Sequence, residues 1–320
     1  MRPPRSFRIF PAARRIALAA AAVAGMMLIA LFWLDATTPD LWLLRPAPRA
    51  VETGAADVPG HYTSGGRVVS RLNLAGPDAM PIEAAVSRPL INEWRLPVII
   101  LIGGFDTGER SVDRVSEPGA NVVIGYGYPD SGVLKADGNP VEKLFLAQRS
   151  AHRVPGQIAA LAEWAAAQPW ADPHRVVLVG VSLGAILAPA AAQAMDEAGV
   201  PPEATVLAYG GADLEALAGA NLRRLPSLWQ RPAAWTIALA LRRLEPARYL
   251  PGLTGDVLVI HASDDRFIPE RSASLLDRLA PASRTIVTLP GGHVLPDDAG
   301  VLAALNAAAK QWLVRIGAVN

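Results

Sequence analysis

A serine between two glycines is the clearest chemical signal in this sequence. Ser182 lies in Gly-Val-Ser-Leu-Gly at positions 180–184, directly after the apolar run 174–180 and before small residues with helical character. This is the pattern G-x-S-x-G in a strand-turn-helix context, in which a sharp turn exposes the serine hydroxyl at a helix N-terminus. A side chain at Gly180 or Gly184 would collide with the neighbouring strand or helix. The pattern therefore predicts Ser182 as a nucleophile.

A hydroxyl is a weak nucleophile, so Ser182 needs a base within reach and an acid that orients the base. His293 follows the apolar run 284–289, and Asp264 and Asp265 follow the run 255–261. Each side chain comes just after the end of a predicted strand, and the order serine, acid, histidine is one that supports this chemistry. We therefore predict His293 as the base and one of these aspartates as the acid.

One more aspartate remains an alternative acid. Asp213 follows the apolar run 203–209, so it also lies just beyond a predicted strand end. The remaining histidines are interpreted as surface, capping or packing residues: His61, His152, His174 and His261. The segment 125–130, Gly-Tyr-Gly-Tyr-Pro-Asp, lacks the third glycine of a dinucleotide-binding fingerprint and is interpreted as pocket lining or a turn.

Composition excludes several other chemistries. The 320 residues include no cysteine, which rules out disulfides, thiolate metal sites and a cysteine nucleophile. No H-E-x-x-H, Walker A or EF-hand pattern occurs, so nothing in the sequence requires a metal or an organic cofactor. The net charge is +1 and five arginines precede residue 16, which leaves a slightly acidic remainder and argues against a nucleic-acid partner.

The elements that must position these side chains alternate along the chain. Near-continuous apolar runs at 96–103, 120–126, 174–180, 203–209, 255–261 and 284–289 are typical of parallel strands that are covered on both faces. Helical stretches are predicted at 143–168, 183–198, 269–279 and 297–316, after an antiparallel hairpin formed by 67–74 and 81–88. The pattern predicts an α/β fold with a mostly parallel, doubly wound sheet and helices on both faces, with ligands bound beyond the strand ends. Residues 212–254 are predicted to form an inserted helical lid or, as the alternative, ordinary crossover helices, because both require the same amphipathic pattern.

The N-terminal segment predicts a membrane anchor. Residues 16–34 carry no charge over 19 positions, which is enough to cross a bilayer, and residues 1–15 form a basic tail expected to stay in the cytoplasm. Residues 35–60 are expected to be a tether and 61–320 the catalytic domain, on the periplasmic or extracellular side of the inner membrane. A cleaved signal peptide, which would release a secreted protein, is the alternative.

The chain from about residue 65 to 315 resembles the α/β-hydrolase family. Segment 262–269, Ala-Ser-Asp-Asp-Arg-Phe-Ile-Pro, is similar to the family pattern G-x-x-D-x-x-V-P, and the resemblance makes Asp265 the acid. The Gly-Gly-His at 291–293 resembles the family's histidine loop. The resemblance also implies an oxyanion hole formed by the N–H of Leu183 and by that of Phe105 or Gly104. Many members of the family have a histidine directly before the glycine of this loop. In this sequence Gly103 occupies that position before Gly104.

The resemblance implies a serine hydrolase that cleaves a carboxylic ester or thioester through an acyl-enzyme on Ser182. The layout is similar to dienelactone-hydrolase-like and acyl-thioesterase-like branches of the family. The expected substrate is a small or lipid-like acyl ester. An acyltransferase that uses the same three residues and a non-catalytic envelope binding module of the same fold are the alternatives.

Overall fold

The computed structural model describes residues 18, 21–22, 24–30, 32–33, 36, 52–58, 66–75, 80–90, 95–104 and 106–320. For residues 52–58, 135, 140 and 141 it describes the backbone only. The chain divides into two compact units, Met1–Thr38 and Pro39–Asn320.

The predicted membrane-spanning helix at 16–34 is wrong. Among the residues described, no helix is both long enough and apolar enough to cross a membrane. A crossing needs about 20 apolar residues because a helix rises only about 1.5 Å per residue. The expected single-pass location in the inner membrane is contradicted by the same finding. The basic tail at 1–15 and most of the tether at 35–60 lie outside the described residues.

The second unit is built on one sheet in the order β1-β2-β3-β5-β4-β6-β7-β8-β9. Strands β4 to β9 pair in parallel, while β1, β2 and β3 form an antiparallel extension that joins the sheet through β5. The strands are β1 (Glu52–Val58), β2 (Arg67–Ala75), β3 (Pro81–Pro89), β4 (Leu96–Ile102), β5 (Val122–Tyr126), β6 (Ala171–Val181), β7 (Ala204–Ala208), β8 (Asp256–Ala262) and β9 (Thr285–Leu289).

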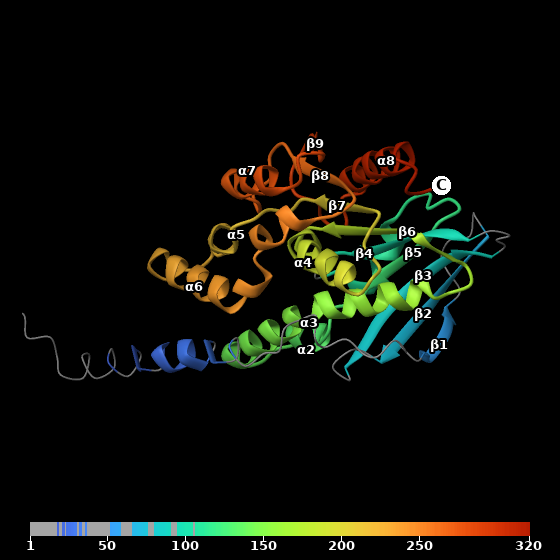
Figure 1. The fold of residues 1–320 in the computed structure, drawn as a ribbon. Coiled ribbons are helices and arrows are strands. Elements are labelled where there is room, and N and C mark those ends of the chain that lie inside the picture. The colour runs from blue at the N-terminus through green and yellow to red at the C-terminus, as the bar shows by residue number, and fades with distance from the viewer. Residues whose placement is uncertain are drawn as a thin grey trace, which may run out of the picture. The chain divides into compact units, whose positions relative to one another are not determined.

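Helices cover both faces of this sheet, as Figure 1 shows. The helices are α2 (Ser131–Lys135), α3 (Pro140–Ala166), α4 (Leu183–Glu197), α5 (Leu214–Asn221), α6 (Ser227–Ala240), α7 (Glu270–Leu279) and α8 (Ala299–Arg315). Four short 3-10 helices join them: η1 (Gly108–Arg114), η2 (Arg242–Leu244), η3 (Pro246–Arg248) and η4 (Leu250–Gly252). The predicted mostly parallel sheet with helices on both faces is therefore present.

Alternate strand residues form two separate cores. Ile100 of β4 belongs to the cluster that contains α3 and α4, whereas Leu101 belongs to the cluster that contains α8. Successive side chains of a strand point to opposite faces, so a strand covered on both sides must be apolar at every position. All five residues of β5 and all five of β7 are buried. This explains the continuous apolar runs in the sequence.

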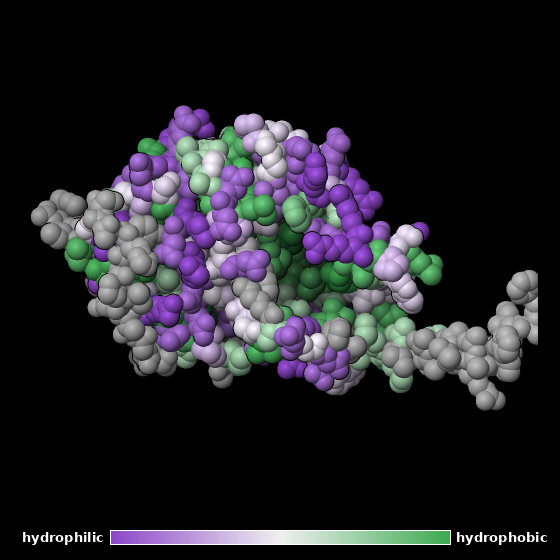
Figure 2. All heavy atoms as spheres, turned by 180° about the vertical axis from the view of Figure 1, so that it is seen from behind, coloured by the Kyte–Doolittle hydropathy of each residue, from purple (hydrophilic) through white to green (hydrophobic). Residues whose placement is uncertain are grey.

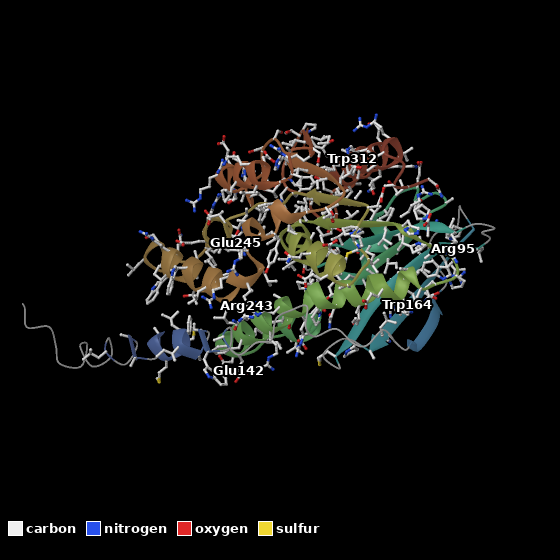
Figure 3. All side chains as sticks on the ribbon, in the orientation of Figure 1. Arg95, Glu142, Trp164, Arg243, Glu245 and Trp312 are labelled. Carbon is white, nitrogen blue, oxygen red and sulfur yellow. The ribbon has the colours of Figure 1, made fainter. Side chains whose placement is uncertain are left out.

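The interval 212–254 contains α5, α6 and three of the 3-10 helices. The carboxylate of Glu245 accepts hydrogen bonds of 2.8 Å from the backbone N–H groups of both Asp213 and Leu214. Glu245 thereby caps the start of α5 from the far end of this interval (Figure 3). This contact joins the start of α5 to the segment after α6. Helices α5 and α6 pack against each other as a hairpin.

Candidate active site

Ser182 lies at the tight turn between β6 and α4. Its backbone has φ +57° and ψ −116°, a conformation that costs a residue with a side chain about 1 to 3 kcal/mol. The Ser182 N–H donates to the carbonyl of Ala208 on the next strand, at 2.9 Å. This bond and the packing of α4 hold the strained turn and present the hydroxyl beyond the sheet edge.

The two glycines of the turn are required by close backbone packing. A Cβ at Gly184 would lie 1.8 Å from the carbonyl oxygen of Ile102, and one at Gly180 would lie 2.6 Å from the carbonyl oxygen of Gly184. The start of α4 therefore rests directly on the end of β4. This contact brings the N–H of Leu183, one of the free N–H groups at a helix start, next to the loop that follows β4.

Ser182, His293 and Asp265 form a chain of two hydrogen bonds. The Ser182 Oγ lies 2.7 Å from His293 Nε2, and His293 Nδ1 lies 2.7 Å from Asp265 Oδ2. The side chains of His293 and Asp265 are each only 8% exposed, so water competes little for these bonds. The arrangement can move a proton from the hydroxyl to the imidazole while the carboxylate orients the ring.

Asp265 is held as a carboxylate. Burial alone raises its pKa, but the hydrogen bond and positive charge of His293 and the N–H groups of Phe267 and Ile268 together lower the pKa below its ordinary value. Those two N–H groups donate to Oδ1 at 2.8 and 3.0 Å, which leaves Oδ2 for the histidine. The loop after β8 thus presents a fixed, ionised acceptor.

Two aromatic rings hold the imidazole, and the sequence analysis did not identify either. Tyr209 meets the His293 ring edge-on with centroids 5.6 Å apart, and Phe267 packs on it at 5.0 Å. Phe267 lies within the aspartate motif, but the motif spacing does not indicate which way its ring points. Tyr209 has a positive φ of 55° directly after β7, and no pattern in the sequence signals that conformation.

The acid loop and the histidine loop are joined by backbone hydrogen bonds. The Asp264 N–H donates to the carbonyl of Gly291 and the Ser263 N–H to that of Leu289, each at 2.9 Å. Gly291 has φ +107°, a conformation that residues with a side chain rarely adopt. Asp264 itself is exposed, and its backbone rather than its carboxylate serves the site.

Asp213, the alternative acid, serves a different purpose. Its side chain accepts from the Ala216 N–H at 3.0 Å, which caps α5, and it pairs with Arg271 at 3.1 Å. It is Asp265 that hydrogen-bonds to His293 Nδ1. Among the other histidines, His261 pairs with Asp277 at 2.8 Å, His152 is buried in α3 and His174 is exposed, while His61 lies outside the described residues.

Hydrogen bonds hold the loop after β4, which contains Gly104, one of the two residues predicted as the second oxyanion donor. The Gly104 carbonyl accepts from the N–H and the hydroxyl of Thr107, at 3.1 and 2.8 Å. A Cβ at Gly103 would lie 2.4 Å from Thr107 Oγ1 and 2.9 Å from Ser111 Cβ, so the family's usual histidine at this position would require these side chains to move. Phe105, the other predicted donor, lies outside the described residues.

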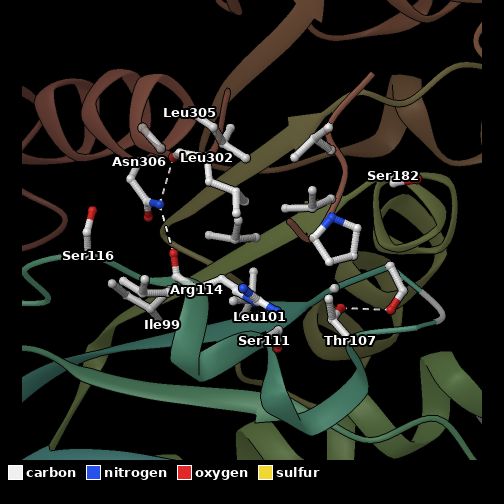
Figure 4. A pocket seen from close by; sticks show the side chains of 18 of the residues that line it. Ile99, Leu101, Thr107, Ser111, Arg114, Ser116, Ser182, Leu302, Leu305 and Asn306 are labelled. Carbon is white, nitrogen blue, oxygen red and sulfur yellow. Dashed lines mark hydrogen bonds between the residues drawn. The ribbon is translucent and has the colours of Figure 1, made fainter. Parts of the chain in front are cut away.

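Two cavities meet at the serine. One, of about 740 Å³, lies among α3, α4, α5 and α6, and is called the α5–α6 cavity below. The other, of about 370 Å³, runs along the sheet face between η1 and α8, and is called the α8 channel; Figure 4 shows part of its lining. Ser182, Leu183, Phe267 and His293 line both. Figure 2 shows a hollow with hydrophobic walls on the face seen from behind.

Residues 151–290 match a family model described as alpha/beta hydrolase fold. The chain has the α/β-hydrolase fold. Acetyl xylan esterase 1 from Thermoanaerobacterium sp. JW/SL YS485 is 18% identical, with a TM-score of 0.59 over 80% of this chain and 87% of that one. An acetyl xylan esterase from Paenibacillus sp. R4 is 16% identical, with a TM-score of 0.60 over 87% of this chain and 93% of that one.

Est1E from Butyrivibrio proteoclasticus, at 16% identity, has a TM-score of 0.55 over 74% of this chain and 95% of that one. No curated protein matches the chain in sequence. The family match and these esterase-like neighbours support the predicted serine hydrolase. Among the described residues of the chain, no group of three or more His, Cys, Asp or Glu side chains could hold a metal ion.

Proposed function

We propose that this α/β-hydrolase cleaves a carboxylic ester or thioester through an acyl-enzyme on Ser182. The observation that carries the proposal is the chain of two 2.7 Å hydrogen bonds from Ser182 through His293 to Asp265, at the mouths of two apolar cavities. An activated serine beside space for both halves of an ester is what acyl transfer requires.

In the first half of the reaction, Ser182 Oγ attacks the ester carbonyl carbon as His293 Nε2 takes the hydroxyl proton. A carbon–oxygen bond forms and the carbonyl oxygen becomes an oxyanion. The N–H of Leu183 and an N–H of the loop at 103–105 are the proposed donors to that oxyanion, a contribution typically worth about 3 to 4 kcal/mol per donor. The bond to the alcohol then breaks, and the alcohol leaves with the proton from His293.

In the second half, water replaces the alcohol beside His293. His293 takes a proton from the water as the water oxygen attacks the acyl carbon. It returns that proton to Ser182 Oγ as the carboxylic acid product leaves. Ionised Asp265 stabilises the imidazolium that forms in both halves. Its lowered pKa keeps it ionised at neutral pH, which suits that role.

The first experiment is labelling of the full chain with a fluorophosphonate, with the adduct located by mass spectrometry. Labelling on Ser182, lost in Ser182→Ala and retained in Ser116→Ala, supports an activated serine. Ser116 is a suitable control because it also lines the α8 channel. Absence of Ser182 labelling in folded protein overturns the proposal and favours a binding module. If Ser182 is labelled but reaction products form only when an alcohol is added as acceptor, the result favours an acyltransferase.

A further inference from the structure

The α5–α6 cavity is far larger than an acetyl group needs. A water-sized group occupies about 30 Å³, and a methylene is of similar size, so an acetyl group fills only a small part of the cavity's roughly 740 Å³. The cavity opens at Ser182 and His293 and extends between α3 and the α5–α6 hairpin. Its volume lies within the usual range for sites that enclose a whole small molecule.

The walls of the α5–α6 cavity are mostly aliphatic and come from four helices. Leu144 of α3, Ile186 and Leu187 of α4, Leu217 of α5, and Ile237 of α6 all line it. Apolar walls bind an alkyl chain because burial removes both surfaces from water. The lining also includes a few polar side chains, among them Gln148, whose buried amide has no hydrogen-bond partner among the described residues.

The α8 channel is smaller and also mostly aliphatic. It lies where η1 follows β4, and Ile99 and Leu101 of the sheet face line it. Polar contacts join α8 to the segment of η1 and the residues after it: Asn306 Nδ2 donates to the Arg114 carbonyl at 2.8 Å (Figure 4), and Lys310 pairs with Glu117 at 3.3 Å.

The difference in volume decides which cavity takes the acyl chain. The α5–α6 cavity, at about 740 Å³, has twice the volume of the α8 channel, at about 370 Å³. Water must reach the acyl carbon beside His293 from the side that the alcohol has left, and the smaller α8 channel provides that side. This assignment gives the larger cavity to the acyl chain.

We infer that the substrate carries a long, apolar acyl chain of about eight or more carbons, which binds in the α5–α6 cavity. The inference rests on the proposed function, because it assumes an acyl-enzyme on Ser182. It separates this chain from an enzyme built for acetyl groups. Each methylene buried in such a cavity raises kcat/KM by up to about fourfold.

The test measures kcat/KM of the full chain for 4-nitrophenyl esters from acetyl to decanoyl, below the concentration at which the longer esters aggregate. The measured quantity is the ratio of decanoyl to acetyl kcat/KM. We expect this ratio to exceed about ten in the wild type. Ala218→Phe, on α5, fills the α5–α6 cavity and is expected to lower the ratio at least tenfold.

Ala309→Phe is the matched control, since Ala309 is also a half-buried helical alanine but lines the α8 channel. It is expected to change the ratio by less than about threefold. Ala147→Phe, on α3, repeats the test from a second wall of the α5–α6 cavity, in case one variant does not fold. Circular dichroism and thermal melting report folding of all three.

A wild-type preference for the acetyl ester overturns the inference. A lowered ratio in Ala309→Phe with an unaltered one in Ala218→Phe and Ala147→Phe also overturns it, because the acyl chain then lies in the α8 channel. Failure of the proposed function has a different result: no ester of any length is cleaved in a Ser182-dependent way, and no fluorophosphonate adduct forms on Ser182.

Discussion

The buried hydroxyl of Tyr128 donates a hydrogen bond of 2.6 Å to the carbonyl oxygen of Gly103. Tyr128 follows β5 and Gly103 follows β4, so this bond joins two adjacent strand ends. Burial raises the pKa of Tyr128, which favours the protonated hydroxyl that donates this bond. The bond fixes the backbone of the loop that is proposed to supply an oxyanion donor.

Tyr128→Phe is expected to lower kcat about tenfold with little change in KM. Loss of the hydroxyl frees the Gly103 carbonyl to turn, and a displaced oxyanion donor weakens transition-state binding more than substrate binding. Steady-state kinetics on one ester provide the measurement. The matched control is Tyr126→Phe, because the buried Tyr126 hydroxyl donates instead to Gln157 at 2.7 Å. Equal losses of kcat in the two variants would contradict a role specific to the loop.

Asp265→Asn is expected to lower kcat by about four orders of magnitude, because an amide at this position no longer holds the imidazole in the required tautomer. Asp213→Asn is expected to change kcat by less than about threefold, since Asp213 caps α5 and asparagine caps equally well. Kinetics of both purified variants check the pair. A large loss in Asp213→Asn with a small one in Asp265→Asn would reverse the assignment of the acid.

Stability is expected to depend on pH through Asp265. Its pKa is lower in the folded protein than its ordinary value of about 4, so the unfolded chain binds the proton more readily. The ionised carboxylate therefore stabilises the fold above about pH 4, and this contribution is lost as the pH falls through the folded pKa.

Urea unfolding of the wild type and of Asp265→Asn between about pH 6 and about pH 3 tests this dependence. The free energy of unfolding of the wild type, relative to the variant, should decrease on acidification. A difference that stays constant or increases as the pH falls would show that the folded pKa of Asp265 is not lowered.

Gly184→Ala is expected to destabilise the fold by about 3 kcal/mol or more, because its Cβ would overlap the Ile102 carbonyl oxygen. Activity should fall as well, since the start of α4 must move away from β4. Gly252→Ala is the control, because no atom lies within 4 Å of a Cβ there. Chemical denaturation measures both. Similar stabilities of the two variants would mean that α4 does not rest on β4 as closely as described.

Much of the candidate site could be predicted from local sequence. Ser182 and its glycines lie within five consecutive residues. The steric reason for Gly180 acts within that turn, whereas the reason for Gly184 is its contact with Ile102 on β4. The strands could be predicted because coverage on both faces requires an apolar residue at every position. Asp265 and His293 could be placed near the same sheet edge, since the carboxyl ends of parallel strands meet there.

Hydropathy alone misled in the N-terminal segment. The uncharged run at 16–34 predicted a spanning helix because hydropathy measures only the apolar character of a segment, whereas no helix among the described residues is long and apolar enough to cross a membrane.

The sequence by itself predicted Ser182 as the nucleophile and determined the order of the chemical groups and the kind of sheet that carries them, because each depends on neighbours in the chain or on strand periodicity. The tertiary structure alone decided that Asp265 rather than Asp213 hydrogen-bonds to His293, that Thr107 packs against Gly103 where a side chain would lie, and that two cavities meet at Ser182. These features depend on loop paths and on side chains from distant elements. Short-range patterns carry no information about such packing.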